Sequence, residues 1–155
     1  MLGGHSAPIR TLVASWCSEF VVGHGEKMKA SALPALVATV DGEPVGVLTY
    51  APRGPEWEVV TLNAVWRGVG VGTALLDALR AAARAAEAER VRLITTNDNT
   101  GALRFYQRYG FDLVALHRDA VTRSRAIKPE IPLSRDGIPL RHELELELLL
   151  RHSAS

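Results

Sequence analysis

The order of apolar and polar positions along the chain predicts strands first and helices afterwards. Apolar residues dominate Leu36–Val40 and Val45–Tyr50, and Asp41-Gly42 between them is a strong signal for a β-hairpin. A turn at Ala51–Pro55, rich in proline and glycine, leads into a further strand over Trp57–Val65. The three segments together predict an antiparallel meander.

Helical periodicity follows the meander. From Thr73 to Glu89 apolar residues recur at spacings of three and four, and alanine, the best helix former, is frequent. A second helix is predicted over Gly101–Tyr109, because Asn99 offers an N-cap and Gly110 a C-terminal stop. These two helices are the clearest elements of the sequence.

The remaining segments give weaker signals. A short helix is predicted over Ile9–Cys17, whereas Glu19–Pro34 reads as irregular. The last strand alternates glutamate with leucine, which predicts one solvated face. Arg118–Arg141 reads as a long, proline-interrupted connection with about one helical turn around Ala120–Ala126. The three short strands expected in this half are Val91–Thr96, Phe111–His117 and His142–Leu150.

Size and charge narrow the class of protein. The 155 residues suit one domain, expected to span residues 1–155. A formal net charge of +1 gives no uniform field for nucleic acid or an anionic membrane, so neither is an expected partner. Cys17 is the single cysteine and fits a reducing compartment. Without a long apolar run or a signal-like amino terminus, the chain is expected to be cytoplasmic.

The stretch Trp66–Leu76, WRGVGVGTALL, places three glycines between a predicted strand and a helix. Glycines there leave several backbone N–H groups unobstructed at the positive end of the helix dipole. This arrangement is typical of an anion site, and phosphate is the usual occupant. The alternative is that the glycines only permit a tight turn.

Comparison with known phosphate loops selects one type. A P-loop would end in Gly-Lys-Ser/Thr, but here Thr73 follows Gly72 directly. The dinucleotide fingerprint fails from either Gly68 or Gly70, because Thr73 and Leu75 stand where the third glycine belongs. The pattern Arg67-x-x-Gly70-x-Gly72 resembles the acyl-CoA pyrophosphate loop of the GNAT N-acetyltransferase superfamily. NTGALRFYQRYGF, from Asn99 to Phe111, is similar to that superfamily's second motif.

The resemblance implies an α/β (α+β) fold with a mixed, mostly antiparallel central sheet flanked by helices. The tail from Lys128 onward looks similar to an uncharacterised bacterial subgroup. Members usually open with a full strand before the first helix, but only Met1–Pro8 precede Ile9, and these are poor strand formers. Either the first strand is missing or replaced, or the helix is shortened.

The same resemblance implies acetyl-CoA as co-substrate, with no metal. The end of the third strand is expected to splay at a bulge, so that its main chain serves the pantetheine and the reaction's oxyanion. Asn99 is expected to bond the pantetheine arm, which is compatible with a plain N-cap role. The expected CoA-binding residues are Leu62, Asn63, Ala64, Arg67, Gly68, Val69, Gly70, Val71, Gly72, Thr73 and Asn99.

Two side chains are expected to carry the chemistry. Tyr106 matches the superfamily tyrosine that gives a proton or hydrogen bond to the leaving CoA sulfur, against the alternative of a core aromatic. Glu58 is the first candidate for the base, with Glu56 on the same face and His117 as third candidate. A solvated strand residue or salt-bridge partner is the alternative for Glu58.

The predicted function is transfer of an acetyl group from acetyl-CoA to a primary amine, of a small molecule or a peptide, by direct attack in a ternary complex. A non-catalytic acyl-CoA-binding or sensing module of the same fold is the alternative. A homodimer is a further expectation, because the leucine face of the last strand suits a dimer as well as the core. Acidic residues that could attract a cationic acceptor are Asp119, Glu130, Glu143, Glu145 and Glu147.

Overall fold

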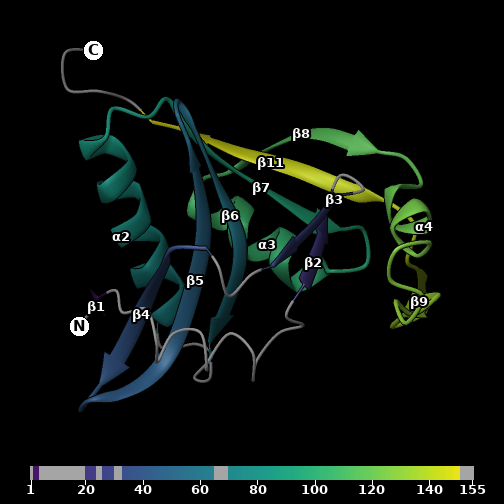
Figure 1. Ribbon diagram of the computed structural model, residues 1–155, viewed down its shortest axis with the longest axis horizontal. Coiled ribbons are helices and arrows are strands. Elements are labelled where there is room, and N and C mark those ends of the chain that lie inside the picture. The colour runs from purple at the N-terminus through teal and green to yellow at the C-terminus, as the bar shows by residue number, and fades with distance from the viewer. Residues whose placement is uncertain (1, 4–19, 24–25, 30–32, 65–69, 151–155) are drawn as a thin grey trace. The chain divides into compact units, whose positions relative to one another are not determined.

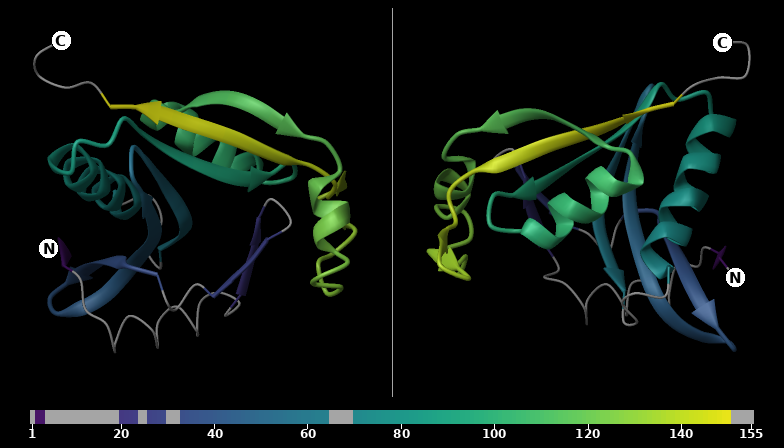
Figure 2. Two further views of the ribbon diagram at one scale, coloured as in Figure 1. Left: turned by 45° about the horizontal axis from the view of Figure 1, so that its top comes forward. Right: turned by 180° about the vertical axis from the view of Figure 1, so that it is seen from behind.

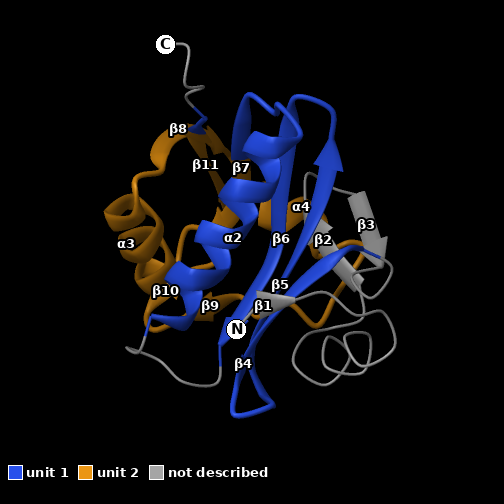
Figure 3. Cartoon of the chain, turned by 90° about the vertical axis from the view of Figure 1, so that its left-hand side faces the viewer, with its two compact units in different colours: residues 1–19, 29–91, 149–155 blue, residues 20–28, 92–148 orange. Residues whose placement is uncertain are grey.

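The structure is a computed structural model that describes residues 2–3, 20–23, 26–29, 33–64 and 70–150. The chain forms two compact units, coloured separately in Figure 3. Unit 1 comprises residues 1–19, 29–91 and 149–155, and unit 2 comprises residues 20–28 and 92–148. The prediction of a single domain over residues 1–155 stays a prediction.

Unit 1 contains the predicted meander, made of β4 (Ala35–Val40), β5 (Glu43–Arg53) and β6 (Glu56–Ala64) (Figure 1). Asp41 and Gly42 both have positive φ, 51° and 80°, as a two-residue hairpin turn of this hand requires. The second turn is shorter than predicted, because β5 continues through Arg53. The predicted hairpin and the antiparallel meander are confirmed.

The described residues include a first strand. β1 (Leu2–Gly3) pairs antiparallel with β4, with Leu2 opposite Ala38. A first strand is therefore present at Leu2–Gly3 rather than missing. The helix predicted over Ile9–Cys17 lies outside the described residues.

Helix α2 (Val71–Ala85) packs on the meander through the predicted apolar stripe. It ends four residues before the predicted Glu89, because Glu87 adopts a left-handed conformation with φ 61°. The N–H of Ala88 then donates to Ala83 O, and the N–H of Glu87 to Arg84 O, which is a Schellman ending without glycine. The buried apolar residues of α2 are Val71, Leu75, Leu76, Leu79 and Ala83.

Unit 2 is built on the strand order β7-β11-β8, and β7 begins in unit 1. In the main sheet, the pairs β1–β4, β4–β5, β5–β6 and β8–β11 are antiparallel, in agreement with the predicted mixed, mostly antiparallel sheet. Leu93, Phe111 and Leu146 are almost fully buried. The elements are β7 (Arg90–Thr96), α3 (Thr100–Tyr109), β8 (Asp112–His117), α4 (Ala120–Ser124) and β11 (Glu143–Leu149).

A bulge offsets β8 from β11. Ala115 lies opposite Glu145 but Leu113 lies opposite Leu146, so Val114 is the extra residue. The predicted solvated face of β11 is wrong: Glu143 is only 3% exposed, and Glu145 is partly buried in ion pairs. The reason is that neighbouring strands supply charged partners on that face.

Two small strand pairs lie in segments that the sequence analysis read as irregular. β9 (Ser134–Arg135) and β10 (Ile138–Pro139) form a hairpin inside the predicted connection. β2 (Phe20–Gly23) and β3 (Glu26–Lys29) form a second two-stranded sheet. In the described part of the chain, no helix has the length and apolar character needed to span a membrane.

Candidate active site

Helix α2 begins at a residue whose backbone conformation favours glycine. Gly70 is the N-cap, with φ 80° and ψ 12°. Glycine has no side chain that could cap the helix, and no acidic residue lies in the first turn. The N–H groups of Val71, Gly72 and Thr73 have no acceptor within the helix, and the helix dipole adds positive potential around them. The amino end of α2 is therefore suited to bind an anion.

Gly46 in β5 fixes the position of this helix end. A Cβ added at Gly46 would lie 2.5 Å from Val71 Cγ1 and 3.3 Å from Asn63 O. Only glycine therefore lets the first residue of α2 pack this closely on β5. The sequence analysis missed Gly46, although glycine inside a buried strand is a known sign of close approach.

The end of β6 stays paired with β5 through the predicted pantetheine segment. Leu62 lies opposite Leu48, Asn63 opposite Val47, and Ala64 opposite Gly46. The bulge on this side falls earlier, at Val60, between the pairs Thr49–Thr61 and Tyr50–Val59. The bulge expected at Leu62–Val65 is therefore wrong for the pairing of β6 with β5 over Leu62–Ala64. All three residues, Leu62, Asn63 and Ala64, are half-buried.

The two glutamates of β6 have different surroundings. Glu56 Oε2 lies 2.6 Å from Arg90 Nη2, and Arg90 Nε donates to the same oxygen at 2.7 Å. Glu58 is only 8% exposed, and it lies opposite Ala51. Glu56 is thus the salt-bridge partner, and Glu58 is the buried carboxyl group of this strand.

Asn99 caps α3 in unit 2. Its Oδ1 accepts a hydrogen bond from the N–H of Ala102 at 3.1 Å, as the N-cap prediction requires. The turn before it is held by Asp98, whose Oδ1 accepts from Thr96 Oγ1 at 2.6 Å. The other oxygen, Asp98 Oδ2, makes no hydrogen bond and lies 3.4 Å from Arg135 Nη1. The Asn99 side chain is exposed at the amino end of the helix.

Tyr106 lies two turns further along α3 and is 8% exposed. Its ring packs edge-on against Phe105 and Phe111, with centroids 5.2 Å and 5.5 Å away. Burial raises the pKa of the Tyr106 hydroxyl well above its ordinary value. The hydroxyl therefore keeps its proton at neutral pH and can act as a hydrogen-bond donor.

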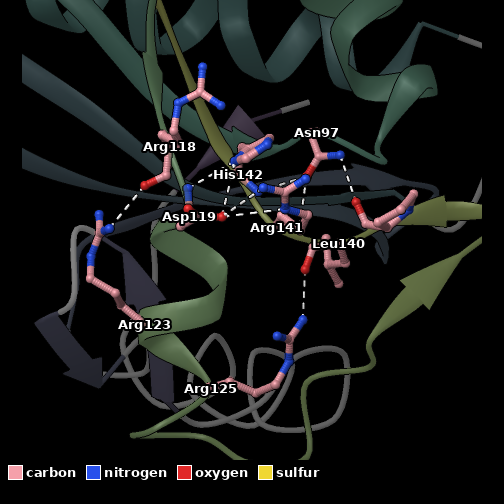
Figure 4. Close-up of polar contacts among 9 residues, drawn as sticks. Asn97, Arg118, Asp119, Arg123, Arg125, Leu140, Arg141 and His142 are labelled. Carbon is pink, nitrogen blue, oxygen red and sulfur yellow. Dashed lines mark hydrogen bonds and ion pairs between the residues drawn. The ribbon is translucent and has the colours of Figure 1, made fainter.

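Asn97 and Asp119 anchor the connection that precedes β11 (Figure 4). Asn97 Oδ1 accepts from the N–H groups of Arg141 and His142, at 3.0 and 2.8 Å, and its Nδ2 donates to Pro139 O at 2.8 Å. The N–H of Asp119 donates to His142 Nδ1 at 2.8 Å. This anchoring role of Asn97 was not predicted, because its partners lie more than 40 residues further along the chain.

His117, the third candidate for the base, belongs to a charged cluster across three strands of unit 2. Glu145 Oε1 lies 2.9 Å from His117 Nε2, and Oε2 lies 3.3 Å from Arg92 Nε. Burial alone would raise the pKa of Glu145. The hydrogen bond with His117 and the charge of Arg92 outweigh it, so this pKa is lowered.

We expect Glu145→Gln to lower the melting temperature by a few degrees at pH 7 and not at all near pH 2. A lowered native pKa contributes stability above the unfolded value, and this is lost as pH falls through the native value. Thermal unfolding, monitored by circular dichroism at several pH values between 2 and 7, measures the difference in melting temperature. Glu130→Gln, on an exposed side chain, is the control. An equal deficit at both pH values would contradict the role of the charge.

The structure assigns the predicted site residues to both units. Leu62, Asn63, Ala64, Gly70, Val71, Gly72, Thr73 and Glu58 lie in unit 1, and Asn99 and Tyr106 lie in unit 2. Arg67, Gly68 and Val69 lie outside the described residues. Among the described residues, no group of three or more His, Cys, Asp or Glu side chains could hold a metal ion.

An antiparallel meander leading to a glycine-capped helix, then a strand and an Asn-capped helix with a tyrosine, is the arrangement of the N-acetyltransferase fold. The sequence matches the acetyltransferase (GNAT) family over residues 10–111. This span covers most of the chain, so the chain belongs to the acetyltransferase (GNAT) family.

Two relatives come from Bacillus subtilis strain 168. The uncharacterized protein YdhI is 40% identical over 104 residues, which are 66% of this chain and 65% of YdhI. The uncharacterized protein YxbD is 44% identical over 107 residues, which are 68% of this chain and 67% of YxbD. The matches thus span about two thirds of these relatives.

The fold is similar to that of a GNAT family acetyltransferase from Elizabethkingia anophelis, whose crystal structure has acetyl-CoA bound. The TM-score is 0.71, the identity 17%, and the match covers 97% of each chain. At this identity the likeness concerns the fold alone.

Proposed function

We propose that the chain is an acyl-CoA-dependent N-acyltransferase that transfers an acetyl group from acetyl-CoA to a primary amine of a small molecule or a peptide. The observation that carries the proposal is the amino end of α2, where the cap is a glycine without a side chain and the first turn contains no acidic residue. In a member of the acetyltransferase (GNAT) family, this end is the natural place for the CoA pyrophosphate.

Most of the residues that would bind the donor lie in unit 1. The loop residues Arg67, Gly68 and Val69 and the helix residues Gly70, Val71, Gly72 and Thr73 would hold the pyrophosphate. The main chain of Leu62, Asn63 and Ala64 and the side chain of Asn99 would bond the pantetheine. This assignment follows the family motif, and the first turn of α2 supports it with N–H groups that have no intrahelical acceptor.

The acceptor amine needs a base. At pH 7 an amine with a pKa of ~10.4 is neutral in only about one molecule in a few thousand, a handicap of roughly 4–5 kcal/mol. Glu58, buried in β6, would accept the proton directly or through water. The amine nitrogen then forms a bond to the thioester carbonyl carbon, the C–S bond breaks, and CoA leaves as a thiolate. The nitrogen releases its second proton to the solvent, which leaves a neutral amide.

Tyr106 would stabilise that thiolate with a hydrogen bond. Complete proton transfer is already uphill from the reference pKa values of ~10 for tyrosine and ~8.5 for a thiol. Burial raises the pKa of Tyr106 further, so that it becomes a weaker acid. Hydrogen-bond donation is therefore the role that the buried hydroxyl fits better.

We expect Tyr106→Phe to lower kcat by roughly 10- to 100-fold, because a hydrogen bond to a charged group contributes ~1.5–3 kcal/mol. The dissociation constant of CoA should stay within about twofold, because the phenyl ring keeps the packing. Steady-state kinetics and calorimetry measure the two quantities. Tyr109→Phe, on the same helix, is the matched control. Unchanged kcat in Tyr106→Phe would remove Tyr106 from the mechanism.

The proposed function is tested by measuring acetyl-CoA binding and thiol release with a panel of primary amines. A Cys17→Ala background removes the chain's single thiol from the assay. Amine-dependent thiol release, with an acetylated amine detected by mass spectrometry, is the expected result. Binding without release for any amine would instead favour a non-catalytic acyl-CoA-binding module. No binding would contradict both functions.

A further inference from the structure

The outer strand of unit 2 carries exposed apolar side chains. β8 pairs with β11 and with no other strand in the described part of the chain (Figure 2). Leu113 is 52% exposed, Val114 46% and Leu116 50%. Natural edge strands are usually protected by charges or cover, because unpaired backbone groups and apolar side chains invite another strand. β8 is therefore a candidate surface for strand pairing.

The bulge at Val114 changes which residues of β8 share a face. In a regular strand, Leu113 and Leu116 would point to opposite faces. The extra residue places both opposite leucines of β11, Leu146 and Leu144, and therefore on one face. In the same way Asp112 and His117 share the other face, because both lie opposite glutamates of β11.

This face assignment makes β8 complementary to itself. In an antiparallel pair of two β8 strands centred between Val114 and Ala115, Leu113 lies opposite Leu116 of the second copy, on the same face. Asp112 lies opposite His117 of the second copy, on the other face. Residues directly opposite in an antiparallel pair interact through their side chains, so the leucine pair is favourable. Asp112 adds a carboxylate beside an imidazole whose Nε2 lies 2.9 Å from Glu145 Oε1 of its own chain.

The charges at the two ends of β8 support the same register. Asp112 lies opposite Glu147 of β11, which makes one end of the strand acidic. At the other end His117 lies opposite Glu143 and contacts Glu145, so the positive charge there comes from the exposed Arg118 that follows it. Antiparallel pairing of two copies brings each acidic end to a basic end.

We propose that β8 is the surface through which two copies of this chain associate, as antiparallel neighbours about a two-fold axis between Val114 and Ala115. One strand pair of six residues is smaller than a standard interface, which buries roughly 1,200–2,000 Å². The association is therefore weak, and its extent depends on protein concentration.

Sedimentation equilibrium of the full chain over a range of concentrations tests the association. The mass should rise from 16.8 kDa toward twice that value. L113K/L116K should weaken it by about tenfold or more, because like charges would face one another across the pair. Leu133→Lys, at a side chain that is 76% exposed outside β8, should leave it unchanged. A constant mass of 16.8 kDa, or equal behaviour of both variants, would overturn the proposal.

Disulfide trapping tests the register separately. In a Cys17→Ala background, a mixture of L113C and L116C should form a crosslinked heterodimer, because opposite Cβ atoms lie about 5 Å apart. L113C alone should crosslink far more slowly, because the two copies of that position would be about 10 Å apart. Equal crosslinking rates would overturn the register. Circular dichroism and CoA binding confirm that each variant is folded.

Discussion

A Glu58→Gln variant is expected to lose roughly 100-fold or more in turnover at neutral pH, while binding acetyl-CoA as tightly as the unmodified chain. A positioned general base contributes about 10²–10⁴ in rate, and glutamine cannot take the proton. The substitution keeps the size of the side chain, so the packing of β6 should survive. Steady-state kinetics with a saturating acetyl-CoA concentration measure the loss.

The pH dependence of this loss separates a base from a merely structural residue. The deficit should shrink as pH approaches the pKa of the amine, because the acceptor then arrives neutral and needs no base. Glu56→Gln is the matched control, since it removes the same charge two residues away, from a partly exposed side chain that is paired with Arg90. If Glu56→Gln loses turnover and Glu58→Gln does not, the assignment of the base is wrong.

The second large effect is expected at the amino end of α2. Gly70→Val should raise the dissociation constant of acetyl-CoA by about 100-fold, or ~2.7 kcal/mol. At φ 80° a β-branched residue is strained, so the chain must leave this conformation and rearrange the first N–H groups of the helix. Isothermal titration calorimetry measures the change.

Gly137 provides a closely matched control. It has φ 78°, against 80° at Gly70, and an added Cβ would meet nothing within 4 Å at either position. Gly137→Val should therefore lower the melting temperature to a similar extent but leave the affinity for acetyl-CoA unchanged. Equal losses of affinity in the two variants would point to a general effect of strain and contradict the pyrophosphate role.

The longer elements whose formation depends on residues close together in the sequence were predicted correctly. Asp41-Gly42 set the β4–β5 hairpin, and the apolar stripe after Thr73 gave α2. The same dipeptide at Asp136-Gly137 closes the β9–β10 hairpin, with φ 54° and 78°, yet it was not recognised. Each of its strands has only two residues, too few for a period-two pattern to be visible.

Features that depend on a neighbouring strand were not predictable from the sequence. The glutamates of β11 read as a solvated face, but Arg92 and His117 approach Glu145 from strands that are distant in the sequence. The bulges at Val60 and Val114 likewise exist only relative to a partner strand. The apolar and polar pattern of one strand does not show which residues of a neighbouring strand lie opposite it, so the register between strands could not be predicted.

For the candidate site, the motifs located the glycines of α2, Asn99 and Tyr106. They could not separate Glu58 from Glu56, because the burial of Glu58 and the pairing of Glu56 with Arg90, 34 residues further along the chain, arise only in the fold. The motifs also did not identify Gly46. A side chain is excluded at Gly46 only because Val71 packs against it in the fold. Tertiary contacts decide both questions.

The strand order has a consequence for synthesis on the ribosome. The meander and α2 occupy residues 35–85 and contact near neighbours in the sequence, so they can form with little loop-closure cost. β11 enters between β7 and β8, although it is made last. The helix that would hold the donor can therefore be in place while Glu143–Leu149 is still being translated, whereas β8 has no partner until those residues emerge.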